Sequence, residues 1–207
     1  EHQGLNGKRL IGDPGFPNVS ADVNLLDANL RLDQVDNIWF PRTGWFVDLA
    51  FQHSIDGENS EIAPFNRGEL LAFGAQTWGR WTGIARVRYG DSFGSDLPFF
   101  GFTLGGLFNL SGRPFGQLSG NTMAFGSLMA RYRINRTPGT IVKGLYAGAT
   151  VEVGNTWDTR NQASASDLLH AGSVFVVTDT LVGPIYIAYG NAGKGNSAFY
   201  LFLNRSF

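Results

Sequence analysis

Hydrophobic and polar residues alternate along most of this chain, a period-two pattern typical of β-strands with two different faces. In 144–155, for example, Val151 and Val153 lie on one face, whereas Tyr146 and Glu152 lie on the other. About ten segments repeat this pattern, each bounded by Gly, Pro, Asn or Asp. They are 22–32, 44–54, 68–78, 81–90, 99–108, 122–134, 144–155, 171–179, 184–190 and 197–207. The repetition predicts an all-β fold: a transmembrane antiparallel β-barrel of about ten strands, within a range of about 8–12.

The last segment, 197–207, has the clearest alternation. Every second residue back from Phe207 belongs to a nearly apolar row, whereas Asn204 and Ser206 begin a polar face. We expect this segment to close the barrel by pairing with 22–32, and its apolar row to act as the C-terminal insertion signal. That row is Phe199, Leu201, Leu203, Arg205 and Phe207.

The charged residues agree with a membrane barrel. If the apolar face of each strand points outward to lipid, nine charged residues of the strands point inward. A soluble barrel of the lipocalin type would have the opposite arrangement. Many Trp and Tyr residues fall near strand ends, where the aromatic girdles of membrane barrels lie, and this favours the membrane. The predicted inward charges are Asp27, Arg31, Asp48, Arg86, Arg88, Arg131, Arg133, Glu152 and Asp179.

Composition excludes other classes of function. The 207 residues include no Cys and 28 Gly, and the net charge of -1 gives no basic excess for nucleic acid. No apolar run is long enough for a spanning helix. The three histidines lack metal-ligand spacing, and no Gly-x-Ser-x-Gly elbow is present. Asp27 and Asp48 are more simply explained by a salt bridge with Arg31 than by acid–base catalysis. We therefore expect no enzyme, cofactor or metal.

Several motifs point to a family. They are Phe40-Pro-Arg-Thr-Gly44, the glycine-rich stretch 100–112, and the stretches 116–120, 130–133, 151–157, 183–190 and 200–207. This ordered series resembles the bacterial surface antigen barrel superfamily, which contains barrel-assembly proteins and two-partner-secretion transporters. It is most similar to the C-terminal barrels of patatin-like phospholipase autotransporters. The resemblance implies a translocator in the outer membrane of a Gram-negative bacterium, with outer-membrane lipid, the barrel-assembly machinery and a polypeptide substrate as partners.

The resemblance also implies a loop that folds back into the lumen after Gly106. In the superfamily a tip arginine of this loop contacts an acidic residue on a neighbouring strand. Here Ser111 and Gly112 stand at the tip, and Arg113 follows. Either Arg113 reaches Glu152, which matches the position of the acidic partner, or Arg113 is solvated. In the second case we expect Glu152 to pair with Arg131 or Arg133, because buried lumen charges need partners.

Domain organisation and topology follow from these expectations. Residues 1–21 are rich in Gly and Pro and are expected to form an irregular extension or plug before the barrel of 22–207. A C-terminus in the periplasm makes 109–121 and 156–170 extracellular. Ten strands would also start the first strand in the periplasm.

Relatives are usually larger barrels preceded by periplasmic domains, so the chain is either a reduced member or a fragment. We prefer a complete small barrel, monomeric or homodimeric. The alternative to a translocator is a structural barrel or narrow passive pore.

Overall fold

The computed structural model describes residues 2–6, 20–55, 64–94, 101–135 and 142–203. The described chain is an all-β structure with two short 3-10 helices, Arg160–Gln162 and Ala165–Asp167. None of the described helices is long and apolar enough to cross a membrane. The strands are β1 (His2–Asn6), β2 (Ser20–Asp33), β3 (Gly44–Ile55), β4 (Asn66–Trp78), β5 (Trp81–Phe93), β6 (Phe102–Leu104), β7 (Leu118–Gly120), β8 (Thr122–Arg133), β9 (Val142–Trp157), β10 (Leu169–Thr180), β11 (Gly183–Asn191) and β12 (Ser197–Leu203).

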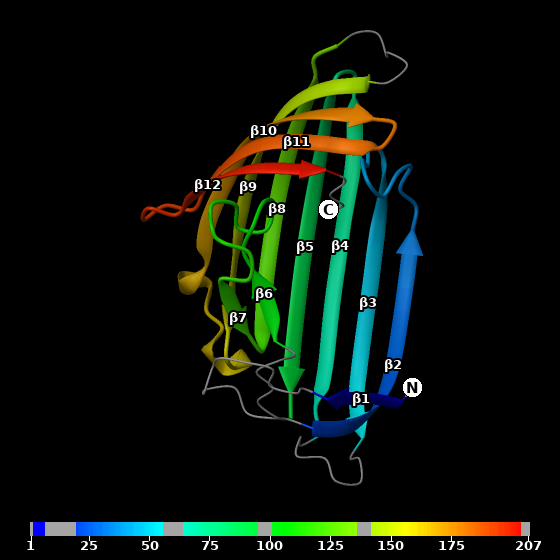
Figure 1. Ribbon diagram of the computed structural model, residues 1–207, viewed down its shortest axis with the longest axis vertical. Helices are drawn as coiled ribbons and strands as arrows, with labels where there is room; N and C mark the ends of the chain where they lie inside the picture. The colour runs from blue at the N-terminus through cyan, green and yellow to red at the C-terminus, as the bar shows by residue number, and fades with distance from the viewer. Residues whose placement is uncertain (1, 7–19, 56–63, 95–100, 136–141, 204–207) are drawn as a thin grey trace.

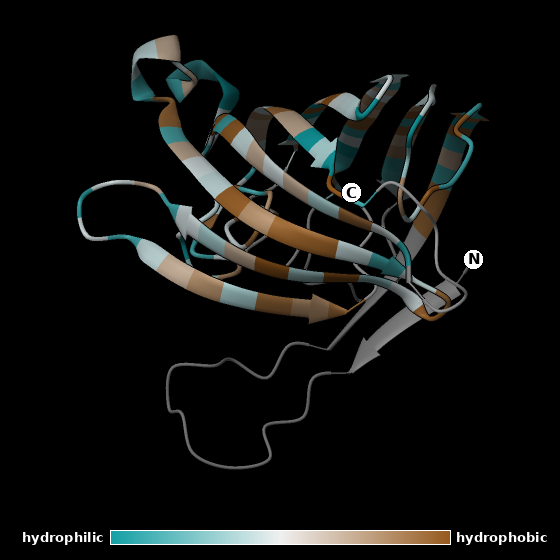
Figure 2. Ribbon diagram, turned by 90° about the horizontal axis from the view of Figure 1, so that it is seen from above, coloured by the Kyte–Doolittle hydropathy of each residue, from teal (hydrophilic) through white to brown (hydrophobic). Residues whose placement is uncertain are grey.

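One antiparallel sheet contains all of these strands except β6 and β7. Its order is β1-β2-β3-β4-β5-β8-β9-β10-β11-β12, so nearly every strand pairs with its neighbours along the chain. The long strands number nine, and β1 adds a short piece paired with 20–24. Figures 1 and 2 show that the sheet curves into a trough whose concave side holds β6 and β7. The predicted period-two segments therefore form strands with nearly the expected bounds, with one exception.

The exception is 99–108, which was expected to be a strand of the barrel. Only Phe102–Leu104 is a strand within it, and this strand pairs with Leu118–Gly120 in a separate two-stranded sheet. The chain leaves the strand conformation at Gly105 and Gly106, whose φ angles are 132° and 94°. Such positive φ values cannot continue a β-strand, so the prediction for this segment is wrong. Instead, β5 pairs directly with β8.

The loss of one strand changes the topology. With nine long antiparallel strands, β2 and β12 run in the same direction, and the start of β2 lies at the opposite end of the sheet from the end of β12 (Figure 1). The expected pairing of 197–207 with 22–32 is therefore not formed by the described residues, which end at Leu203. Among the described residues β12 pairs with β11 alone, and β2 pairs with β1 and β3, so the sheet is not closed.

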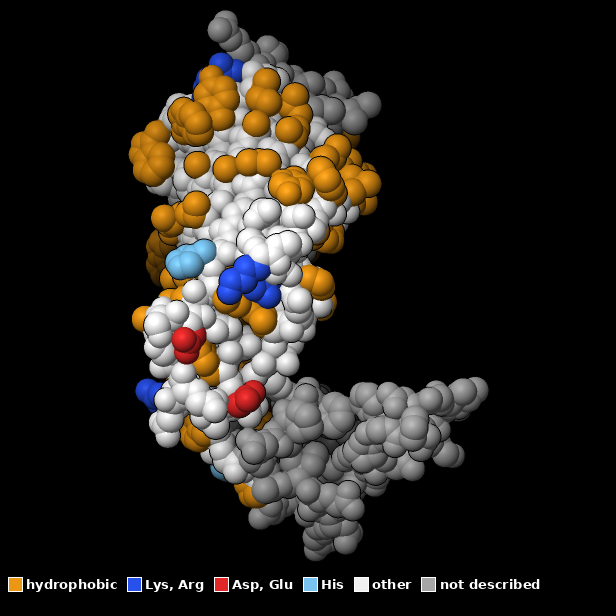
Figure 3. Space-filling view, turned by 90° about the vertical axis from the view of Figure 1, so that its left-hand side faces the viewer, with side chains coloured by type: hydrophobic (Ala, Val, Ile, Leu, Met, Phe, Trp, Pro, Cys, Tyr) orange, Lys and Arg blue, Asp and Glu red, His pale blue; other side chains and the backbone are white. Residues whose placement is uncertain are grey.

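The two faces of the sheet differ in chemistry. On the convex face, many of the alternate residues are large exposed apolar side chains, as in Leu26, Leu30, Val87, Val151 and Ile187, each more than half exposed. Figure 3 shows hydrophobic side chains spread over one side of this surface with few charges among them. The three described residues of the predicted C-terminal row, Phe199, Leu201 and Leu203, belong to this face and are 83%, 74% and 60% exposed. Arg205 and Phe207 lie outside the described residues.

The concave face is packed against the chain between β6 and β7. One buried cluster joins Leu107 and Phe108 to aromatic side chains of the sheet, including Phe175 and Tyr186. The ring of Phe108 makes edge contacts with both rings, at centroid distances of 5.2 and 5.4 Å. A second cluster joins Leu104 and Leu110 to Phe102, Met123 and Phe125. The hydrophobic core is thus formed between a loop and the inside of a sheet.

The N-terminal stretch 1–21 differs in part from the expected irregular extension. His2–Asn6 forms β1, antiparallel to the beginning of β2. Residues 7–19 lie outside the described part of the chain.

Candidate functional site: the loop on the concave face

The candidate site is the inner loop, defined as residues 105–117 between β6 and β7. The loop closes on itself at its base, where Gly105 N donates to Asn109 O at 2.7 Å and Gly106 N donates to Arg113 O at 2.9 Å. A side chain at Gly105 would place its Cβ 2.0 Å from the carbonyl oxygen of Pro114, so only glycine fits this crossing. Leu107 and Leu110 are completely buried and fix the loop to the sheet.

Ser111, at the tip of the inner loop, binds Glu152 of β9. Ser111 N donates to Glu152 Oε2 and Ser111 Oγ donates to Oε1, both at 2.7 Å. Thr150 Oγ1 also donates to Oε1, at 2.5 Å. Ser111 is 0% and Glu152 3% exposed. The carboxylate is therefore held by three neutral donors, which suits a buried charge because each charge-assisted hydrogen bond is about twice as strong as a neutral one.

Neither sequence-based expectation for Glu152 matches this arrangement. Arg113 does not contact Glu152, and its Nη1 instead donates to Gln117 Oε1 at 3.4 Å. Arg131 and Arg133 do not bind Glu152 either, because they donate to the carbonyl oxygens of Pro41 and Lys143. The loop supplies a hydroxyl and a backbone N–H where an arginine was expected.

Gly112 brings the inner loop against the far edge of the sheet. Its N–H donates to the hydroxyl of Tyr200 on β12 at 2.8 Å. The φ angle is 103°, and a Cβ at this position would come within 2.7 to 2.8 Å of the backbone of Asn191, Ala192 and Asn196. Gly112 is therefore required twice, for its backbone conformation and for this close approach.

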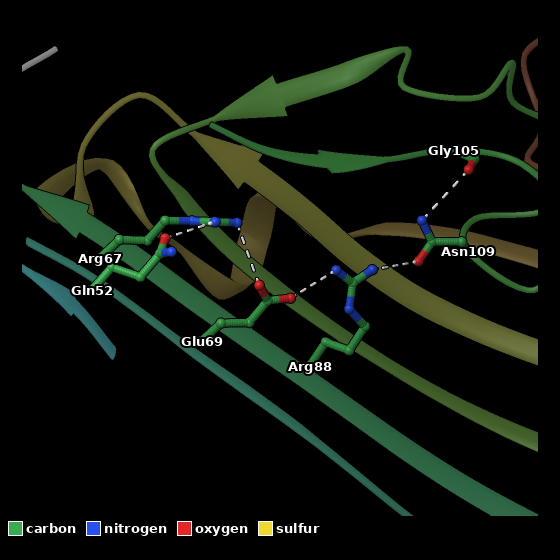
Figure 4. A network of polar contacts seen from close by, with 6 residues as sticks. All are labelled: Gln52, Arg67, Glu69, Arg88, Gly105 and Asn109. Atoms are coloured by element: carbon green, nitrogen blue, oxygen red, sulfur yellow. Dashed lines mark hydrogen bonds and ion pairs between the residues drawn. The ribbon is translucent and has the colours of Figure 1, made fainter. Parts of the chain in front are cut away.

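A chain of polar side chains connects the other side of the inner loop to β3, β4 and β5 (Figure 4). Arg88 donates to Asn109 Oδ1 at 3.2 Å and to Glu69 Oε1 at 3.1 Å. Glu69 also accepts from Arg67 at 3.3 Å, and Arg67 is 3.4 Å from Gln52 Oε1. These groups are partly exposed, with side-chain exposure of 28% for Glu69 and 22% for Arg88. This second anchor, formed by Arg88 and Glu69, is therefore ionic and solvent-accessible, in contrast to the buried anchor at Glu152.

Two further arginines of the concave face contact backbone carbonyl groups. Arg86 donates to the carbonyl oxygen of Phe108 in the inner loop. Arg131, which is completely buried, donates to Pro41 O and lies with its guanidinium carbon 3.7 Å from the ring centroid of Phe40. The Phe40-Pro41 corner between β2 and β3 thereby covers one end of the core, since Phe40 belongs to the same cluster as Phe108.

The other predicted inward charges lie away from the inner loop. Asp48 forms a salt bridge with Arg31, at 2.5 Å between Nη2 and Oδ2. Asp27 accepts from Gln52 Nε2 at 2.9 Å, and Gln52 joins it to the far end of the polar chain that reaches the inner loop. Asp179 lies near the end of β10, opposite Gly144 and Pro184 in neighbouring strands. The predicted charges therefore form several local groups instead of one network.

Several residues of the site were not predicted from the sequence. Arg67 and Glu69 are two residues apart on β4 and share its concave face, so the period-two pattern could have predicted their inward direction. Asn109 and Tyr200 bind the loop through ordinary polar groups, for which the sequence carries no comparable signal.

The arrangement is suited to holding a loop in place. Among the described residues, no group of three or more His, Cys, Asp and Glu side chains is placed to hold a metal ion. No model of a known protein family matches this chain, and no curated protein matches it.

Proposed function

We propose that this chain forms the wall of an outer-membrane β-barrel that moves or inserts polypeptides, with the inner loop occupying the lumen. The observation that carries this proposal is the opposite chemistry of the two faces of one sheet. Large exposed apolar side chains lie on the convex face, while the inner loop and the charged side chains that anchor it lie on the concave face. In a membrane barrel the lipid-facing and lumen-facing residues alternate in this way.

The aromatic residues support a membrane position. Trp78 and Trp81 flank the short turn at one end of the sheet and are 65% and 55% exposed, and the ring of Trp81 lies 4.9 Å from that of Tyr132. Near the other end, Tyr189 and Phe199 form a second outward pair at 4.9 Å. Aromatic side chains at both ends of an apolar band are the arrangement of interfacial girdles.

The sheet edges set a condition for the proposal. A bilayer offers no hydrogen-bond partners to an open strand edge, so a membrane-spanning sheet must close into a ring. We therefore propose that further strands, beyond those of the described sheet, bridge β2 and β12.

The test is insertion of the refolded full-length protein into lipid vesicles. Leu30 and Asn29 are neighbours on β2 with opposite faces, which provides a matched pair. Leu30→Arg places a charge on the apolar face and should reduce insertion strongly, since a lipid-facing arginine costs about 2–4 kcal/mol near the bilayer centre. Asn29→Arg should insert like the wild type, because Asn29 lies beside Asp48 on the concave face, 2.6 Å from its carboxylate. Equal insertion of both variants would contradict a membrane position.

A second candidate function is a structural barrel or narrow passive pore. The inner loop favours it, because two hydrophobic clusters and two polar anchors hold this loop on the concave face. Single-channel recording of the inserted protein separates the two. Steps of stable size indicate a passive pore, and silence that gives way to conductance when the Glu152 anchor is removed indicates a gated translocator.

A further inference from the structure

The Phe40-Pro41 corner, residues 34–43 between β2 and β3, reaches across the concave face. Phe40 packs on Tyr146 of β9, with 5.0 Å between the ring centroids, and Pro41 O accepts from Arg131 of β8. Because β4 and β5 separate β3 from β8 in the sheet, the corner crosses both strands to make these contacts. The corner therefore spans the trough at the end where β4 turns into β5.

The corner is braced within itself and has few links to more distant strands. Asp36 Oδ1 accepts from two backbone N–H groups of the corner, at 2.8 and 3.1 Å, and Asn37 Oδ1 accepts from two others, also at 2.8 and 3.1 Å. Among the described residues, two hydrogen bonds join the corner to strands other than β2 and β3. One comes from Arg131, and the other runs from Thr77 Oγ1 to Arg42 O at 2.7 Å. The corner can therefore move as a unit, since a segment with few outside contacts opens more readily than the sheet.

The closed position of the corner has an energetic cost at Arg131. This side chain is completely buried, and its guanidinium carbon lies 3.7 Å from the ring centroid of Phe40. Its Nε and Nη1 atoms have no hydrogen-bond partner among the described residues. Burying a charged group without its full set of hydrogen bonds is unfavourable, and water reaches these donors when the corner lifts. The closed position is therefore less stable than the burial of Phe40 alone would make it, which suits a part that opens.

The corner and the inner loop meet in one hydrophobic cluster, to which Phe40 and Phe108 both belong. Phe40 contacts Tyr146, which lies directly opposite Val177 in the next strand. Val177 also lies opposite Tyr186, whose ring contacts that of Phe108 at 5.4 Å. Each of these side chains is at most 3% exposed. Because a closely packed core fills a lost volume only in part, lifting either end of this row weakens the packing of the other.

We propose that the corner is a second gate of the lumen and that it opens together with the inner loop. The inner loop lies in the connection from β5 to β8, and the corner connects β2 to β3 at the opposite end of the sheet. The two segments thus form one plug that is held from both ends. Their coupling acts equally in both directions, as every coupling free energy between two sites does. This inference rests on the proposed function, because a gate requires the concave face to line a lumen.

Thiol labelling of the refolded full-length protein in detergent micelles tests the coupling. The chain contains no cysteine, so Pro41→Cys reports opening of the corner and Leu110→Cys reports opening of the inner loop, both from buried positions. Ser54→Cys, at a buried position of β3 outside the cluster, reports unfolding of the sheet as a whole. The alkylation rate of a buried thiol measures how often its segment opens.

The first variant acts on the corner. Phe40→Ala should raise the alkylation rate at Pro41→Cys at least about a hundredfold, the effect expected when a buried Phe side chain is removed from a core. It should also raise the rate at Leu110→Cys by at least about fivefold, the lower end of typical couplings between sites. Trp39→Ala is the matched control, because Trp39 is an aromatic residue of the same corner but is 46% exposed, and this variant should change neither rate.

The second variant acts on the inner loop. Phe108→Ala should raise the alkylation rate at Pro41→Cys by at least about fivefold, although Val177 and two tyrosine rings separate Phe108 from the corner. Phe115→Ala is its control, because Phe115 belongs to the same loop but is 84% exposed, and this variant should leave the rate unchanged.

The outcomes are distinct. An effect confined to the altered segment in either variant, no rise at Pro41→Cys with Phe40→Ala, or an equal effect of a control would overturn the coupled gate. An equal rise at Ser54→Cys would overturn it too, because the sheet would then open as a whole. Labelling in micelles does not depend on insertion into a bilayer. If Leu30→Arg and Asn29→Arg insert as expected but the cross-effects are absent, this inference fails while the proposed function stands. If the cross-effects appear but both variants insert equally, the proposed function fails and only the coupled movement remains.

Discussion

The buried anchor of the inner loop makes a quantitative prediction for Glu152→Gln. The substitution keeps an oxygen for the hydroxyls of Ser111 and Thr150 but places an NH2 group where Oε2 accepts from Ser111 N at 2.7 Å. One hydrogen bond to a charged group is lost, which contributes about 1.5–3 kcal/mol. Opening of the loop should therefore become about 10 to 150 times more frequent, since about 1.4 kcal/mol corresponds to a factor of ten.

Thiol labelling measures this opening. The chain has no cysteine, so Leu110→Cys gives a single reporter at a completely buried position of the inner loop. Its alkylation rate reports how often the loop leaves the sheet, because a buried thiol reacts through the open state. The rate should rise by the stated factor when Glu152→Gln is added. Asp48→Asn is the control, a carboxylate of the concave face whose described partners are Asn29 and Arg31. A rise below about threefold, or an equal rise with Asp48→Asn, would show that Glu152 does not hold the loop.

Two further predictions concern the rest of the loop. Arg88→Met should raise the same alkylation rate only about two- to fivefold, because partly exposed ion pairs contribute about 0.2–1 kcal/mol. The difference from wild type should vanish in about 1 M salt, which screens such pairs. A larger effect that does not depend on salt would show that this anchor is as strong as the buried one. Gly112→Ala should destabilise the folded protein by at least about 3 kcal/mol, measured in thermal melts followed by circular dichroism. Gly116→Ala is the control, also at positive φ but with open space around it, and should cost about 1 kcal/mol. Similar melting temperatures for the two variants would show that the close approach of Gly112 to β12 is unimportant.

Strand positions were predictable because alternation is a local property. The predicted segments 44–54 and 122–134 correspond to the strands Gly44–Ile55 and Thr122–Arg133. Each has one apolar row that faces outward, and this row can be recognised from the residues of the segment alone. The segment 99–108 shows the limit. Phe102 and Leu104 alternate with Thr103 as expected, but the chain then turns, and the non-glycine residues Phe108 and Leu110 adopt φ angles of 61° and 70°. Their burial stabilises this conformation, and local sequence does not report it.

The candidate site was predictable only in outline. The sequence indicated an inward loop near Ser111 and an inward Glu152, and the structure brings these two residues together. The sequence did not predict the nature of the contact, because a buried carboxylate is expected to pair with a cation. A backbone N–H can satisfy a buried carboxylate equally well, and every non-proline residue has one, so composition carries no signal for it.

The odd number of long strands restricts how a complete ring can be assembled. A second copy inserted in the same orientation would place its β2 beside β12 of the first, giving two parallel seams, in which hydrogen bonds are slanted and pairing is slightly weaker. An inverted copy would give antiparallel seams. However, the two copies would then have opposite orientations in the bilayer, and so would their inner loops. An odd number of alternating strands inserted between β12 and β2 avoids both problems. The direction of two edge strands thus makes a twofold assembly of this sheet the less favourable way to seal it against lipid.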